Sequence, residues 1–278
     1  MNAAIRAKSV VAAPPADRGI FLVKRIHFAP DPPPGATIVR RFHQPRPCVA
    51  SEEILDAAPS TVGADGFIVA LISPEASAER VASEILIGDD GTALAVAVGG
   101  QKIQWRPGYA VVQGPAAGLN HSLEALIDFA FYEGELRRLE EALGAREDRA
   151  QEDVERAYFI SYDDRKHWPR LTKLGADLCR MRLTYARLAP ELTQVSRTMA
   201  AEARRIAARL LDEAAISDRL QAFSDRLEAC EDLYEGAIDR IAEFRWYRGG
   251  QWLEKGIILL LLLELAVMAA DAYVAHLK

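Results

Sequence analysis

Hydrophobic and polar positions follow two different periods along this 278-residue chain, and the change falls near residue 118. Before that point, short apolar runs alternate with turns rich in glycine and proline, which is typical of β-strands. After it, apolar residues recur every three or four positions, as they do on one face of a helix. The pattern therefore predicts an α+β protein, with a small α+β domain at residues 19–118 and a helical coiled-coil region at residues 119–255.

The first region contains several apolar runs of strand length, which we expect at residues 20–28, 37–39, 93–98, 102–105 and 110–112. The continuous run Gly66–Ile72 has no polar face, so we expect it to be a central strand. Gly99–Gly100 predicts a hairpin turn. Two short helices are expected, at Ser51–Ala57 and at residues 73–86, because each begins with a serine that can cap a helix. Residues 1–18 lack periodicity and predict a flexible tail.

Two long apolar series with alternating three- and four-residue steps dominate the helical region. The first consists of Leu171, Leu174, Leu178, Met181, Tyr185, Leu188, Leu192, Val195 and Met199, and the second of Ile216, Leu220, Phe223, Leu227, Cys230, Tyr234, Ala237, Ile241 and Phe244. Such spacing is typical of a coiled-coil seam. A reversal at residues 213–217 favours an antiparallel hairpin over one continuous rod, and Pro190 is expected to kink the first helix.

Two further helices are expected before these series. One begins with Asn120 or Ser122 as its cap and runs through Leu143, and the other covers residues 147–162. The second is expected to end at Asp163–Asp164, a short distance before Trp168–Pro169, because the residue before a proline avoids the α-helical conformation.

The C-terminal segment, residues 256–278, predicts a membrane anchor. Ile257–Ala275 is nineteen residues long, and at about 1.5 Å per residue it matches the hydrocarbon core of a bilayer. Its ten Ile, Leu and Val residues favour insertion. The carboxylates of Glu264 and Asp271 oppose insertion, so the summed free energy of membrane insertion is close to zero. The alternative is a buried core helix with two acids at its edge.

Residues that flank this segment favour the anchor. Trp246 and Trp252 precede it, as in an aromatic belt at the membrane interface. Arg248 and Lys255 add positive charge on the same side, whereas only Lys278 follows the segment. By the positive-inside rule the sequence predicts a single pass, with the N-terminal bulk of the chain in the cytoplasm.

Glu264 and Asp271 lie seven residues apart and therefore share one face of the last helix. Ionisable residues inside a membrane are costly and usually functional. One spanning helix cannot form a pore alone, so a role for this face requires a homo-oligomer. We expect the two acids to lie at a helix–helix interface rather than along an ion path.

The C-terminal part of the chain also resembles a known family. Leu233-Tyr234-Glu235, followed by Leu253-Glu254 and an aliphatic run that carries Glu264, is similar to the C-terminus of the "required for meiotic nuclear division" family. Tyr132-Glu133 resembles an aromatic–Glu pair of that family, whereas Gly249–Gly250 departs from its pattern. The resemblance implies an N-terminal α/β region, a helical region and one hydrophobic C-terminal segment. It also implies oligomers and, in eukaryotic members, support of organellar translation at the mitochondrial inner membrane, without established catalytic residues.

Composition narrows the chemistry. Forty acidic residues against 34 Lys and Arg give a net charge of −6, which argues against a nucleic-acid partner. The three cysteines are far apart and fit neither a disulfide framework nor a metal site, so a reducing compartment is expected. Asp163, Asp164 and His167 carry metal-ligand atoms, but their place at a helix break favours capping. Phosphate-loop, dinucleotide, serine-hydrolase and zincin motifs are absent from the sequence, so no catalytic residue, cofactor or metal is predicted.

These features together favour a non-enzymatic, membrane-anchored scaffold or assembly protein. Its coiled-coil hairpin would present the α+β domain and mediate self-association or binding of protein partners. One alternative is a soluble enzyme or ligand-binding protein whose site lies in residues 19–118 and whose last helix belongs to the core. Another alternative is an oligomeric, ion-conducting assembly with Glu264 in its pore.

Overall fold

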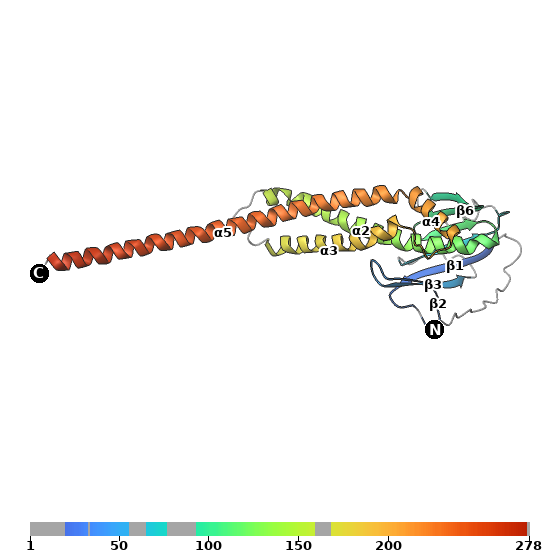
Figure 1. Cartoon of the computed structure of the whole chain (residues 1–278), viewed down its shortest axis with the longest axis horizontal. Helices are drawn as coiled ribbons and strands as arrows, with labels where there is room; N and C mark the ends of the chain where they lie inside the picture. Colours follow the sequence, from blue (N-terminus) through green and yellow to red (C-terminus); the bar gives the residue numbers. More distant parts are fainter. Residues whose placement is uncertain (1–19, 33, 56–64, 77–92, 159–167, 277–278) are drawn as a thin grey trace. The chain divides into compact units, whose positions relative to one another are not determined.

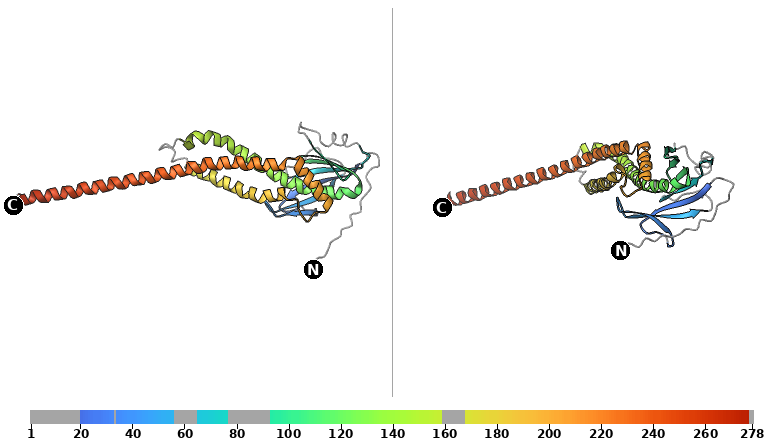
Figure 2. Two further views of the ribbon diagram at one scale, coloured as in Figure 1. Left: turned by 45° about the horizontal axis from the view of Figure 1, so that its top comes forward. Right: turned by 45° about the vertical axis from the view of Figure 1, so that its right-hand side comes forward.

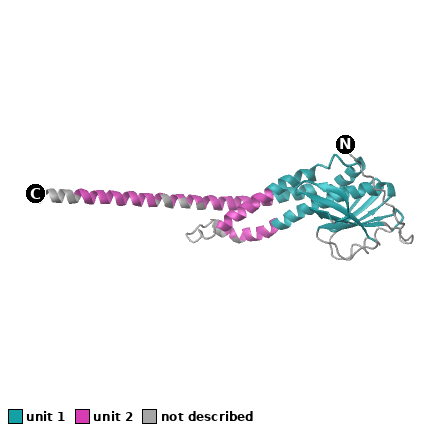
Figure 3. Cartoon of the chain, turned by 90° about the horizontal axis from the view of Figure 1, so that it is seen from below, with its two compact units in different colours: residues 1–142, 183–224 teal, residues 143–182, 225–278 magenta. Residues whose placement is uncertain are grey.

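The computed structural model describes residues 20–32, 34–55, 65–76, 93–158 and 168–276 (Figure 1). Within these ranges the chain forms seven strands and four helices, so the expected α+β class is confirmed. The chain divides into two compact units (Figure 3). Unit 1 consists of residues 1–142 and 183–224, and unit 2 consists of residues 143–182 and 225–278.

One seven-stranded sheet lies in unit 1. Its strands are β1 (Ile20–Ala29), β2 (Thr37–Phe42), β3 (Cys48–Leu55), β4 (Gly66–Ile72), β5 (Leu94–Val98), β6 (Gln101–Arg106) and β7 (Tyr109–Gln113). Their order across the sheet is β2-β3-β1-β4-β7-β6-β5. All neighbours are antiparallel except β4 and β7, which are parallel. The continuous apolar run of β4 lies at the centre and is almost wholly buried, as its composition predicts.

The turns of this sheet follow the predicted glycines. Gly99 and Gly100 join β5 to β6 with φ of +59° and +81°, the conformation that a two-residue hairpin of this hand requires. Pro107 and Gly108 join β6 to β7, and Gly108 has φ of +86°. The expected hairpins at this side of the sheet are therefore confirmed.

The helix expected at Ser51–Ala57 is wrong, because residues 48–55 form strand β3. Glu52 and Glu53 do not stabilise a helix N-terminus. Their carboxylates instead accept hydrogen bonds from Lys24 and Arg25 on β1, at 2.7 and 3.3 Å. Cross-strand pairs of opposite charge stabilise a sheet. Lys24 and Arg25 are 28 positions away from these glutamates, so a local sequence pattern for a helix start could not reveal the pairing. Most of the helix expected at residues 73–86 lies outside the described residues.

The helices are α2 (Ala116–Tyr158), α3 (Trp168–Thr193), α4 (Ala201–Glu213) and α5 (Ile216–His276). Helix α2 begins before both expected caps, and the Ser122 hydroxyl donates to the Gly118 carbonyl one turn earlier. It also continues through residues 144–146, where a break was expected, because a single glycine costs a helix only about 1 kcal/mol. The expected stop at Asp163–Asp164 lies outside the described residues.

The first apolar series does not form one helix. Helix α3 ends at Thr193, three residues after Pro190, and α4 follows after a short connection. Helix α4 is absent from the sequence prediction, although it buries Ala203, Ile206, Ala207 and Leu210 on one face. The predicted reversal before the second series is present at Ala215, whose φ is +47°.

Helix α2 lies against the sheet within unit 1 (Figure 2), and aromatic side chains join the two. Phe131 of α2 stacks on Phe42 of β2, with ring centroids 3.9 Å apart. Phe129 meets Trp105 of β6 edge to face at 5.6 Å. Such pairs add to the apolar area that they bury and fix the position of α2 on the sheet.

Unit 2 is built from parts of α2, α3 and α5. Asp153 of α2 accepts hydrogen bonds from Arg170 of α3 at 3.1 Å and from Tyr234 of α5 at 3.4 Å. Burial, together with the charge of Asp153, raises the pKa of Tyr234 to about 12, so this phenol stays protonated and able to donate. Arg182 of α3 forms an ion pair with Glu231 of α5 at 2.5 Å. This ion pair and the Asp153 contacts are consistent with an antiparallel arrangement of α3 and α5 in this unit.

Candidate functional site

Three carboxylates of α2 are buried in unit 1, namely Asp128, Glu133 and Glu135. Buried acids are rare unless they are paired, because transfer of an unpaired charge from water costs several kcal/mol. Each of these acids has an arginine partner from another element of unit 1. The sequence analysis identified none of the three as a site residue.

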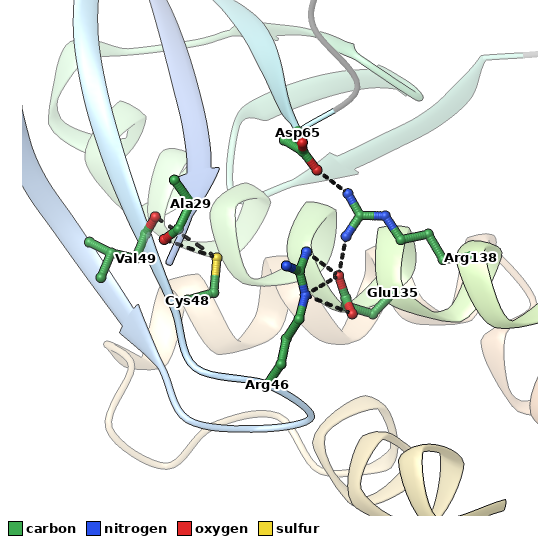
Figure 4. A network of polar contacts seen from close by, with 7 residues as sticks. All are labelled: Ala29, Arg46, Cys48, Val49, Asp65, Glu135 and Arg138. Atoms are coloured by element: carbon green, nitrogen blue, oxygen red, sulfur yellow. Dashed lines mark hydrogen bonds and ion pairs between the residues drawn. The ribbon is translucent and has the colours of Figure 1, made fainter. Parts of the chain in front are cut away.

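Glu135 lies at the centre of the network in Figure 4. Arg46, from the connection between β2 and β3, donates to both of its oxygens, at 2.9 and 3.2 Å. Arg138, one turn along α2, donates to Glu135 at 2.5 Å and also to Asp65. The hydrogen bond to Glu135 raises the pKa of Arg46 above its usual value, so the pair stays charged. The network ties two loops of the sheet to α2.

Glu133 makes a second connection of the same kind. Its carboxylate accepts hydrogen bonds from Arg137 at 2.5 Å and from Arg219 of α5 at 3.1 Å. Arg219 also binds Glu140 at 2.6 Å, and its hydrogen bonds raise its pKa. The first turn of α5 is thereby fixed to α2 within unit 1.

A cleft of about 250 Å³ lies beside these networks. Its apolar lining includes Phe28, Phe67, Trp105 and Phe131, and its polar lining includes Asp65, Glu133, Glu135, Arg137, Arg138 and Glu141. Glu141 is exposed and has no salt-bridge partner among the described residues. The free carboxylate of Glu141 makes the cleft suited to a small ligand with a positive charge, whereas the rings of Phe67, Trp105 and Phe131 are themselves buried.

The cleft and its surroundings show no activated nucleophile. The Cys48 thiol (Figure 4) is buried and contacts the carbonyl of Ala29 at 3.5 Å. Burial raises its pKa, which keeps it in the less reactive thiol form. His121 lies 3.4 Å from Glu202, away from the lining of the cleft. Within the described ranges, no three His, Cys, Asp or Glu side chains converge as metal ligands. The metal candidates Asp163, Asp164 and His167 lie outside those ranges.

The predicted seam residues form buried faces. Leu178 and Leu192 of α3 are buried, as are Phe223 and Leu227 of α5, whereas the side chain of Ile241 is outside the described set. In unit 1 the two seams meet where Tyr185 stacks on Phe223. Helix α2 also packs against α5, a contact that the two-helix prediction lacked.

The residues predicted to lie at a membrane belong to α5 in unit 2. Trp246 and Trp252 are 79% and 67% exposed, and the Lys255 ammonium lies 5.8 Å from the Trp252 ring. Glu264 is exposed, and the side chains of Arg248 and Asp271 lie outside the described set. Every large apolar side chain from Ile257 to Met268 is at least half exposed. Over the described part of the chain, no helix has an apolar stretch of sufficient length and hydropathy to cross a bilayer.

The charged networks escaped the sequence analysis because their partners lie far apart along the chain. Arg46 and Glu135, for example, are separated by 89 positions. One signal was present. Asp128, Glu133 and Glu135 lie among the buried apolar positions of α2, and acids so placed on a helix need partners.

Comparisons with known proteins give no close relative. No family model matches the chain, and no curated protein matches it. The CorA magnesium transporter from Methanocaldococcus jannaschii aligns with a TM-score of 0.35 and 12% identity, covering 84% of this chain and 80% of the transporter chain. The full-length CmaX protein aligns with a TM-score of 0.36 and 11% identity, covering 85% and 82% of the two chains. At such TM-scores neither likeness establishes a shared fold.

Proposed function

We propose that this protein is a membrane-anchored, non-enzymatic scaffold. Its C-terminal helix would hold it in a bilayer, and its α+β part would be presented to partners in the cytoplasm. The apolar end of α5 carries the proposal. A helix that is apolar on all sides is normally buried in protein or lipid, yet the side chains from Ile257 to Met268 are exposed.

The flanks of this apolar run support a bilayer as its surroundings. The apolar sequence continues beyond Met268 to Ala275 with Asp271 as its one acid. Exposed Trp246 and Trp252 precede it, and Lys255 lies beside the Trp252 ring. Aromatic rings and basic groups are enriched at the interface between lipid and water. The excess of basic residues on this side supports a cytoplasmic location for the N-terminal bulk.

The fate of the protein after removal of residues 256–278 tests the anchor. The full-length chain should stay in the membrane pellet after carbonate extraction, whereas the truncated chain should be found in the supernatant. The truncation should keep its helical signal in circular dichroism, because α2, α3, α4 and most of α5 precede the cut. A matched control replaces residues 257–268 with a Ser- and Gly-rich segment of equal length and should behave like the truncation. Retention of both variants in the pellet would contradict the proposal.

Self-association of the anchor is a further part of this proposal. Glu264 is the only ionisable residue from Gly256 to Met268. A carboxyl group in lipid is costly unless it is protonated or hydrogen-bonded to a neighbouring helix. Membership in the "required for meiotic nuclear division" family, which the sequence resembles, also stays a proposal and implies oligomers.

The cleft in unit 1 supports a second candidate function, the binding of a small organic cation. Glu141 offers an unpaired carboxylate at a cleft with aromatic lining, and this observation favours the candidate. Titration of the full-length protein with an aromatic guanidine, followed by tryptophan fluorescence, tests it, because Trp105 lines the cleft. Glu141→Gln should weaken the response at least tenfold, while Glu228→Gln on α5 should leave it unchanged. An equal response in both variants would exclude the cleft as the binding site.

A further inference from the structure

A second, smaller cavity of about 30 Å³ lies in unit 1 beside Asp128 of α2. Its walls are largely apolar, and its polar lining residues are Asp128, Tyr132, Glu191 and Ser196. The volume suffices for a single water molecule, which needs about 10 to 15 Å³ by this measure. The carboxyl groups of Asp128 and Glu191 therefore line the same small cavity.

The two oxygens of Asp128 have different surroundings. Oδ2 accepts a hydrogen bond of 2.8 Å from Nη2 of Arg40. Oδ1 is fully buried, and no hydrogen-bond donor among the described residues reaches it. The side chain as a whole is only 9% exposed. A buried carboxylate oxygen without a donor destabilises the fold, because it loses its hydrogen bonds to water and forms no hydrogen bond in the protein to replace them.

Arg40 connects this carboxylate to the edge of the sheet. It belongs to β2, the outermost strand, which pairs with β3 alone in the described sheet. The first part of β2 is exposed, and Phe42 at its end is buried against α2. The Arg40–Asp128 ion pair and the Phe42 ring thus both attach β2 to the helix.

Burial opposes the ionisation of Asp128, and the charged groups around it act in both directions. Arg40 on β2 favours the carboxylate, whereas Glu124 on α2 and Glu191 on α3 repel it. Tyr132 donates its hydroxyl to Glu191 at 3.2 Å, and α4 contributes only apolar residues to the cavity. Burial is the largest effect, and together these raise the pKa of Asp128 from 3.8 to about 6.

We propose that Asp128 is a proton-binding site that fastens and releases the edge strand β2. In the ionised state, the carboxylate holds Arg40 and fixes β2 to α2. A proton from solvent binds the free Oδ1 and removes the negative charge of Asp128. Neutral Asp128 lacks the charge that attracts Arg40, and this arginine is 27% exposed and can return to water. Strand β2 is then held mainly by its pairing with β3 and by Phe42.

Hydrogen–deuterium exchange of the full-length protein tests this device at pH 7.5 and 5.0, with rates corrected for the intrinsic effect of pH. Amides of residues 37–42 should exchange about tenfold faster at pH 5.0, as expected for loss of one partly buried, charged hydrogen bond. Asp128→Asn should exchange fast at both pH values. Arg40→Met should also exchange fast at both pH values. Arg41 is the next residue and is exposed, so Arg41→Met is the control and should retain the wild-type response to pH.

Several outcomes would overturn the proposal. The first is an exchange rate of the β2 amides in the wild type that is the same at both pH values. A pH response that persists unchanged in Asp128→Asn would assign it to another group. If Asp128→Asn does not fold, Arg40→Met decides, because a wild-type response in that variant would show that the ion pair does not hold β2.

Discussion

Tyr185 of α3 stacks on Phe223 of α5, with ring centroids 5.2 Å apart and ring planes inclined by 30°. The Tyr185 hydroxyl also donates a hydrogen bond of 3.1 Å to the carbonyl of Leu220, one turn before Phe223. Both aromatic residues occupy seam positions predicted from spacing alone. The aromatic pair and the hydrogen bond together fix the register of α3 against α5 in unit 1.

Leu227→Asp should destabilise the protein strongly, because Leu227 is fully buried on the same seam of α5. An unpaired carboxylate at this position must be desolvated or protonated, at a cost of several kcal/mol. Thermal unfolding followed by circular dichroism should show a clearly lower midpoint. The exposed neighbour provides the control, since Glu228→Ala should shift the midpoint little. Similar losses in the two variants would mean that the seam has another register.

Arg219→Met should lower the free energy of unfolding by about 2 kcal/mol, because buried Glu133 and half-buried Glu140 both lose a charged partner. Arg137 remains beside Glu133 and limits the loss. Arg209→Met on α4 is the matched control, because among the described residues that arginine pairs only with exposed Asp212 and Glu213 and should contribute about 0.5 kcal/mol or less. Urea denaturation of both variants measures the difference. A loss no greater than that of the control would show that Arg219 holds α5 to α2 no more strongly than an exposed ion pair would.

The raised pKa of Asp128 predicts how stability depends on pH. The folded state binds a proton more tightly than the unfolded state, so this group favours folding at low pH and loses that contribution as pH rises from about 4 to 6. Asp128→Asn imitates the protonated form. At pH 7.5 it should therefore be as stable as the wild type or more stable, by up to about 3 kcal/mol.

Urea denaturation between pH 4.5 and 7.5 checks this expectation. The Asn variant should lose the part of the pH slope that belongs to Asp128, while Glu124→Gln should keep most of it. A marked fall in stability of the Asn variant at pH 7.5 would show that the bond to Arg40 outweighs the cost of burying the charge.

Periodicity predicted those features that arise from burial on a regular element. Leu178, Leu192, Phe223 and Leu227 repeat with the helix, so their buried face could be predicted from the sequence. The run of β4 could be predicted for the same reason. The spacing of apolar residues does not show how many helices pack together. The sequence analysis therefore missed the packing of α2 against α5.

Features that depend on distant partners could not be predicted in this way. Ser51 with Glu52 has the local pattern of a helix start, but Lys24 on the neighbouring strand binds Glu52 and favours β3. Arg46 and Glu135 likewise meet only because the β2–β3 connection lies over α2. Local patterns report on the chain nearby, whereas the candidate site is made of contacts between elements.

The last prediction concerns the acids of the proposed anchor. Replacement of Glu264 and Asp271 by leucine should keep or improve membrane retention, because two costly polar groups are removed from lipid. Association of copies should nevertheless weaken, since helices in lipid rely on packing and interhelical hydrogen bonds rather than on the hydrophobic effect. Each lost contact should cost about 1 to 2 kcal/mol, equivalent to a dissociation constant about 5- to 30-fold higher.

Sedimentation equilibrium of the full-length protein in detergent measures this change. Glu254→Gln, before the apolar run, is the control and should associate like the wild type. The sensitivity of the measurement is greatest near the wild-type dissociation constant, so the two proteins should be compared over the same range of concentrations. Unchanged association in the double-leucine variant would show that these acids do not hold helices together. In that case, ion flux in liposomes would become the deciding measurement, because an ion path is the remaining role that requires both acids on one face of an oligomer.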